Sequence, residues 1–217
     1  MPVLFFCSFG RICVILNKKG ALQVTDQEQF EEIYQTHITR AGGAELLEWL
    51  RKTDFFAAPA STRFHCACRG GLVKHSVSVY RTLRGRHFDE GDNEESFAIC
   101  GLLHDICKTQ YYKESTRNVK NDETGQWEKQ PYFSVEDSFP YGHGEKSVFM
   151  IERFLRLKTS EAVAIRWHMG GFDDAARAGN FAIGVAYNKY PLAVKLHLAD
   201  LESTYLREHG TSEISQK

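Results

Sequence analysis

The chain has 217 residues, a net charge of −1 and 42% apolar residues. This is the composition of a globular domain, and the length suits one domain with short extensions. The charge balance excludes a broad basic surface for long nucleic acid, and the apolar residues 1–16 are too few to cross a bilayer. Six scattered cysteines without a framework spacing, and no secretory signal of ordinary form, predict reduced thiols in a cytoplasmic protein.

The N-terminal part of the chain carries no recognisable chemistry. Residues 1–16 are expected to form a strand on the body or to be poorly ordered. Residues 25–39 are predicted to form a polar helix, because Thr25 and Glu28 have the spacing of a capping box. A second helix is expected over residues 44–54.

Two helices in the middle of the chain carry the first informative residues. Residues 71–84 show an apolar stripe, and His75 lies on it. Residues 94–106 are apolar nearly all round, which predicts a helix buried on every side, and they contain the pair His104-Asp105. Burying a carboxylate there costs several kcal/mol unless it is paired or binds a metal.

Lys108 follows this pair at the spacing of one helical turn. If the helical twist continues, its side chain shares the face of His104 and Asp105 and sets a cation beside a metal. The next segment, residues 109–135, mixes aromatic and charged residues around a turn signal at 121–125, which predicts an inserted β-hairpin. Because it follows Lys108 directly, we expect it either to overhang the site as a lid or a specificity element, or to lie on the body as a surface flap.

The C-terminal third adds two histidines and an aspartate. His143 lies between two glycines before a helix expected over residues 145–157, and His168 ends a helix over 160–168 that Thr159 is expected to cap. Residues 172–190 are expected to be irregular or weakly helical.

The last helix is expected to begin at Pro191, where a missing N–H costs nothing. Asp200 lies on the same face of this helix as Leu196 and His197, and an ionised aspartate there needs a partner such as a metal. The chain from Arg207 onward is polar and is expected to be frayed.

The order of these residues resembles the HD-domain superfamily of metal-dependent phosphohydrolases. The resemblance is carried by Gly-Gly-Leu-Val-Lys-His-Ser at 70–76, His-Asp-Ile-Cys-Lys at 104–108 and the distant aspartate of Leu-His-Leu-Ala-Asp at 196–200. It covers about residues 70–206. Cys107 departs from the family's common glycine, and we expect it to touch no ligand. The two intervening histidines resemble the branch that binds two metals.

The resemblance implies a mainly α fold, an HD-domain-like helical bundle with one inserted β-hairpin at about 109–135. The HD domain would span residues 42–208. Residues 1–41 would form an N-terminal segment with a short helix, packed on the body or partly disordered, and 209–217 a frayed tail.

The resemblance also implies a ligand set and a reaction. The first metal would be held by His75, His104, Asp105 and Asp200, and Asp105 would bridge to a second metal held by His143 and His168. Nitrogen and oxygen ligands without an obligatory thiolate suit one or two divalent ions among Fe, Mn, Zn, Ni, Co and Mg. The expected reaction is attack at phosphorus by a metal-activated hydroxide, with catalytic roles for Asp105, Lys108 and Asp200. The loop at 59–69 precedes the first ligand helix, so Arg63 and His65 are expected, with Lys108, to contact the phosphate.

The expected partner is a nucleotide or another small phosphoester, without a membrane or long nucleic acid, and homo-oligomerisation stays open. Three alternatives remain at this stage. The first is a di-iron oxygenase of the same fold, and the second is a non-catalytic nucleotide-binding module. The third is a zinc site built from the cysteines Cys66, Cys68, Cys100 and Cys107.

Overall fold

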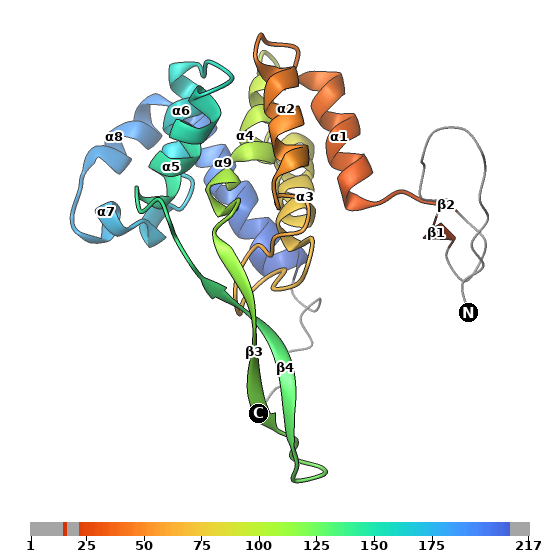
Figure 1. The fold of residues 1–217 in the computed structure, drawn as a ribbon. Coiled ribbons are helices and arrows are strands. Elements are labelled where there is room, and N and C mark those ends of the chain that lie inside the picture. Colours follow the sequence, from red (N-terminus) through yellow and green to blue (C-terminus); the bar gives the residue numbers. More distant parts are fainter. Residues whose placement is uncertain (1–14, 17–21, 209–217) are drawn as a thin grey trace.

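A computed structural model of the chain describes residues 15–16 and 22–208. The expectations for residues 1–14 and for the tail at 209–217 lie outside the described residues. The described chain is mainly α-helical, with one long antiparallel hairpin inserted into the helical body (Figure 1). The predicted fold class, a helical bundle with an inserted hairpin, is confirmed.

The helices alternate with loops and short turns. They are α1 (Asp26–His37), α2 (Gly43–Lys52), α3 (Gly71–Arg86), α4 (Glu94–Leu103), α5 (His143–Glu152), α6 (Thr159–Arg166), α7 (Asp174–Arg177), α8 (Ala182–Lys189) and α9 (Pro191–Glu202). Two 3₁₀ turns, Ile106–Lys108 and Gly170–Phe172, and a π-helical turn, Ser203–Arg207, complete the helical structure. None of the helices in this described part of the chain combines the length and apolarity that crossing a bilayer requires.

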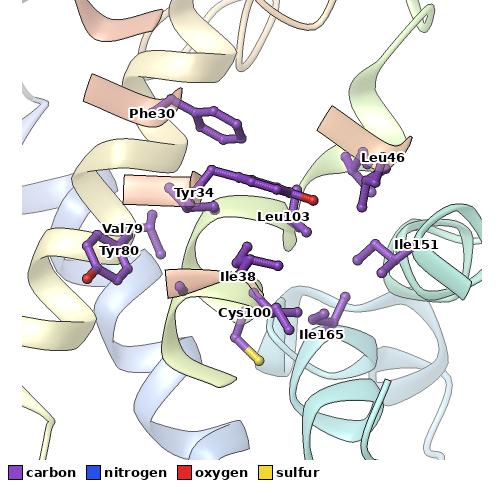
Figure 2. Packing of buried hydrophobic residues seen from close by; sticks show 14 of the residues in the cluster. Phe30, Tyr34, Ile38, Leu46, Val79, Tyr80, Cys100, Leu103, Ile151 and Ile165 are labelled. Carbon is purple, nitrogen blue, oxygen red and sulfur yellow. The ribbon is translucent and has the colours of Figure 1, made fainter. Parts of the chain in front are cut away.

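Helix α4 lies at the centre of the body, as its composition predicts. Its residues from Ser96 to Leu103 are all buried, and the helix packs against α1, α3 and α6. Figure 2 shows Cys100 and Leu103 of α4 among buried side chains of α1, α2, α3, α5 and α6. Gly101 lies directly on the α3 backbone, since a Cβ atom there would come within 2.6 Å of the Tyr80 Cα. The bare glycine therefore sets how closely α3 and α4 approach each other.

A partly buried ion cluster joins the chain after α1 to the starts of α4 and α6. The Arg40 guanidinium lies 2.7 Å from a carboxylate oxygen of Glu161 and 3.1 Å from one of Glu95. Glu161 is fully buried and also accepts a hydrogen bond from the Ser96 hydroxyl at 2.6 Å. Because a buried carboxylate is costly without partners, this cluster locks three elements in one arrangement.

The predicted helix ends are confirmed in part. Thr25 and Glu28 form the expected capping box of α1, and Pro191 is the first residue of α9. Helix α6 begins at Thr159, so the predicted Thr159 cap is wrong; the Glu161 carboxylate accepts the backbone N–H of Lys158 instead, at 2.7 Å.

Helix α4 ends earlier than predicted, at Leu103 rather than at residue 106. The Asp105 backbone leaves the helical region, with φ −105° and ψ 18°, and the 3₁₀ turn follows. Residues 172–190 are more helical than expected, because they contain α7 and α8.

The hairpin consists of β3 (Tyr112–Lys120) and β4 (Trp127–Val135), and its pairing runs from Tyr112 opposite Val135 to Lys120 opposite Trp127. It extends away from the helical body, and most of its side chains are exposed (Figure 1). Over most of its length the hairpin therefore does not pack on the body as a flap, whereas Tyr112 and Val135 at its base line the cavity described below. A second, minimal pair joins β1 (Ile15–Leu16) to β2 (Leu22–Gln23).

Candidate metal centre

Five elements bring the six predicted metal ligands together. His75 lies in the first half of α3, and Asp200 lies in the last half of α9, which packs against α3. The other four lie at or just beyond helix ends. They are His104 and Asp105 after α4, His143 as the first residue of α5, and His168 after α6. Residues separated by more than a hundred positions therefore meet in one region.

The first half of the centre is formed by His75, His104, Asp105 and Asp200. The Nε2 atoms of His75 and His104 face each other at 3.3 Å. The His75 Nε2 lies 3.2 Å from Asp200 Oδ1 and 3.7 Å from Asp105 Oδ2, and the His104 Nε2 lies 3.6 Å from the same Asp105 oxygen. His75, His104 and Asp200 form one cluster that could hold an ion.

The second half of the centre uses the other oxygen of Asp105. Oδ1 lies 2.7 Å from the His143 Nε2 and 3.5 Å from the His168 Nε2. The Asp105 carboxylate thus directs Oδ2 toward one pair of imidazoles and Oδ1 toward another. This is the geometry by which one carboxylate can serve two ions.

Two of the histidines are oriented by backbone carbonyls. The Nδ1 of His104 lies 3.0 Å from the carbonyl oxygen of Gly101, and the Nδ1 of His168 lies 2.6 Å from that of Ile165. A carbonyl can only accept, so Nδ1 carries the proton in each ring and Nε2 keeps the lone pair that binds metals. This arrangement of a fixed outer nitrogen and a free inner one is typical of metal-binding histidines.

The His168 ring supplies a direct test of whether a metal fits. His168 is fully buried, and its Nε2 has no hydrogen-bond partner among the described residues. Leaving a buried polar atom unpaired costs about 1–3 kcal/mol. A cation shared with the Asp105 carboxylate would satisfy that lone pair, so the residues present fit a metal.

The protonation states of Asp105, Asp200 and His104 also suit a bound cation. Burial would raise the pKa of Asp105, but Lys108 and the nearby histidines hold it well below its usual range. Hydrogen bonding to His75 similarly overcomes burial and lowers the pKa of Asp200. Burial lowers the pKa of His104 to about 3, which keeps this ring neutral. Two ionised carboxylates, Asp105 buried and Asp200 partly buried, beside a neutral imidazole provide the donors that a divalent cation requires.

His143 is held differently, and here one expectation fails. The Sγ of Cys107 lies 3.4 Å from the His143 Nδ1, so the prediction that Cys107 touches no ligand is wrong. Burial favours the neutral form of His143, but Cys107 and Asp105 outweigh it and raise its pKa to about 10. The same sulfur lies 3.8 Å from the His143 Nε2, so Cys107 contacts both ring nitrogens and belongs with Asp105 and His143 to a group that could hold an ion.

A cavity of about 700 Å³ opens onto the centre. Its polar floor contains His75, Asp105, Lys108, His143 and Asp200, and the Lys108 Nζ lies 2.6 Å from Asp105 Oδ2. Its walls are largely aromatic and apolar, and they include Phe64, Tyr111, Tyr112, Phe172, Leu201 and Tyr205. The volume lies in the range of sites for small organic ligands, about 300–1,000 Å³.

The two residues of the loop before α3 that were predicted to contact phosphate have different positions in the structure. His65 lines the cavity, with its ring centroid 4.6 Å from that of His75, and neither ring nitrogen has a hydrogen-bond partner among the described residues. Burial lowers the pKa of His65 to about 4. Arg63 is exposed and does not line the cavity. A loop position alone could not tell these two apart, because the direction of each side chain depends on local backbone geometry.

The structure also adds a residue that the sequence did not single out. Glu208, assigned to the frayed C-terminal part, is buried, and both its carboxylate oxygens lie 3.1 Å from the His75 Nδ1. A polar residue just after the last predicted helix gives no periodic signal of burial, so no pattern could have found it.

The alternative cysteine site does not form. Within the described chain, the clusters that could hold an ion contain at most one cysteine each, and Cys100 lies in the apolar core.

No family model, no curated protein and no solved structure matches this chain.

Proposed function

We propose that the chain is a metal-dependent phosphohydrolase of the HD-domain type, acting on a small phosphoester. The observation that carries the proposal is that the two carboxylate oxygens of Asp105 face two different pairs of imidazoles, three of which are buried. The order of ligands along the chain, which resembles that superfamily, supports it independently. The first metal would be held by His75, His104, Asp105 and Asp200, and the second by Asp105, His143 and His168.

The divalent ions, when bound, would lower the pKa of a coordinated water toward neutrality and neutralise phosphoryl oxygens. The side chains of this chain supply the rest. Lys108 projects its ammonium group into the cavity beside Asp105, where it can donate hydrogen bonds to a phosphoryl oxygen. Asp200 is ionised, partly exposed to the cavity and bonded to His75, so it is placed to accept the proton of the attacking water. His65 borders the same space and offers two unpaired ring nitrogens to the substrate.

The cavity walls favour one kind of phosphoester. Its volume far exceeds that of an inorganic phosphate, and its walls are mainly aromatic and apolar. Lys108 and Arg177 are the lysine and arginine side chains among the lining residues of the described chain, and Lys108 is already paired with Asp105. A chain of phosphates would need more cations than this. The substrate we propose therefore has one phosphoryl group attached to a flat, largely apolar organic group, such as a nucleoside monophosphate.

Elemental analysis of the purified protein, followed by a phosphatase and phosphodiesterase panel with Mn, Co, Ni and Mg added back, tests the proposal. We expect bound divalent metal and hydrolysis of monophosphates in preference to triphosphates. Asp105→Ala should lose metal and most activity, because it removes the shared ligand. Asp89→Ala is the matched control, since Asp89 is an exposed aspartate that pairs with Lys195 at the surface.

Full metal content and rate in Asp105→Ala would refute the assignment. Two bound irons with oxygen consumption and no phosphoester hydrolysis would favour the oxygenase instead. Nucleotide binding without turnover under any metal would favour a non-catalytic module.

A further inference from the structure

Glu208 faces the side of His75 that points away from the proposed metals. The carboxylate is 4% exposed, and each of its oxygens lies 3.1 Å from the His75 Nδ1. It also accepts from the Cys66 thiol at 3.4 Å. On the opposite edge of the ring, the His75 Nε2 faces Asp200 and the Nε2 of His104. The imidazole of His75 is therefore held between Glu208 and the centre.

The π-helical turn Ser203–Arg207 directs the Glu208 carboxylate toward His75. On a continuous α-helix, eight residues correspond to two turns plus about 80°, so Glu208 would point to a different face from Asp200. A π turn has more residues per turn and therefore rotates the chain less, which reduces that offset. As a result, Asp200 and Glu208 contact opposite nitrogens of one ring. Single π turns inside helices are frequent at functional sites.

His75 differs from the other three histidines in what supports it. In His104 and His168 the outer nitrogen meets a neutral carbonyl, and in His143 it meets the Cys107 sulfur. Among these rings, His75 is the one whose outer nitrogen meets a carboxylate. A carboxylate behind a metal-binding histidine fixes the tautomer and ring orientation and makes the ring a stronger donor.

We infer that Glu208 is a positioning residue of the metal centre: it holds His75 with its Nε2 lone pair toward the ion and thereby strengthens metal binding. The inference rests on the proposed function, because it assumes that His75 binds metal. It adds that the segment after α9, which has no place in the ligand motif, belongs to the site.

The experiment compares Glu208→Gln and Glu208→Ala with wild type and with Glu202→Gln. Glu202 is the matched control, since it ends α9 close by but pairs at the surface with Arg86. Affinity for Co²⁺ is measured by competition with a chromophoric chelator, and the visible spectrum of bound Co²⁺ reports the coordination geometry. Unfolding of the metal-free proteins is measured alongside, to separate loss of stability from loss of binding.

We expect both Glu208 variants to bind Co²⁺ about 10–100-fold more weakly, as is usual when such a partner is removed, and to show an altered spectrum. Glu202→Gln should match wild type. Glu208 variants that lose only stability, with unchanged affinity and spectrum, would overturn the inference and leave the proposed function standing. A wild-type protein that binds no metal would instead overturn the proposed function itself, and the inference with it.

Discussion

Gly101→Ala tests whether the packing of α4 on α3 sets the geometry of the candidate site. The new methyl group would lie 2.6 Å from the Tyr80 Cα and 2.9 Å from its Cβ. Moving the first contact to the usual carbon–carbon separation of about 3.5 Å requires the helices to part by about 0.9 Å. The obstacle is backbone, so a side-chain rotation cannot relieve it.

The displacement acts on both stability and metal binding. Overpacking of this kind costs about 1–3 kcal/mol. Because α3 carries His75 and α4 leads into His104, the distance between their Nε2 atoms, now 3.3 Å, would change as well. Metal–ligand distances tolerate only about 0.2 Å of error, so a shift several times larger should weaken binding strongly.

Gly85→Ala is the matched control, because Gly85 lies in α3 and a Cβ atom added there would meet no other atom within 4 Å. Both variants gain the helix propensity of alanine, up to about 1 kcal/mol. The difference between them therefore isolates the contact with Tyr80 and should be about 1–3 kcal/mol in the free energy of unfolding. Urea unfolding and Co²⁺ competition measure the two effects. If Gly101→Ala unfolds and binds metal like Gly85→Ala, the reasoning is refuted.

Three further changes test other parts of the structure. Glu161→Gln should cost about 3 kcal/mol at neutral pH, because it breaks the buried pair with Arg40. Burial would raise the pKa of Glu161, but hydrogen bonds from Arg40 and other groups outweigh it and lower the pKa. Its stabilisation is therefore complete above the ordinary value of 4.5 and is lost as pH falls through the lower folded value, so urea unfolding should show the deficit shrinking in acid. Cys107→Ala should release the metal proposed beside His143 more readily, whereas the exposed Cys68→Ala should not; equal metal-to-protein ratios after dialysis against a chelator would contradict this. Replacing the hairpin beyond its base by a short Gly-Ser link should leave the unfolding free energy and metal content unchanged, since its exposed strands pair with each other; a destabilised body would show that the strands support it.

The sequence predicts most of the helices because their signals are local. The capping box at Thr25 and the proline at Pro191 mark helix starts, and the apolar run before His104 marks the buried centre. The prediction is wrong where a group distant in the sequence determines the local backbone. The end of α4 is misplaced because Asp105 turns out of the helix toward histidines from other elements, which no local pattern contains.

The ligand motif predicted the residues that face the candidate metal positions better than the residues that contact those ligands from behind. Six residues were named from their order along the chain, and all six meet. Cys107 and Glu208 were misjudged because what they do depends on which ring nitrogen they face. That is a matter of side-chain direction, and spacing along a sequence does not encode it.

The two oxygens of Asp105 divide the centre unequally. On the Oδ2 side lie His75, His104 and Asp200, so that position has four protein donors with Asp105 itself, and Glu208 supports one of them. On the Oδ1 side lie His143 and His168, which give three donors with Asp105, and the Cys107 thiol supports one.

More donors and a carboxylate behind a histidine both strengthen metal binding. In the proposed two-metal centre, the Oδ2 position would therefore hold its ion the more tightly, with ligands that come from α3, α9 and the end of α4. The proposed Oδ1 position would have fewer protein ligands, and His143, which lines the cavity, is partly exposed, so this position would be the more open to exchange and to the substrate. Under the proposed function, such an unequal pair would give one ion a structural role and the other a role in binding the phosphoryl group, with the Asp105 carboxylate shared between them.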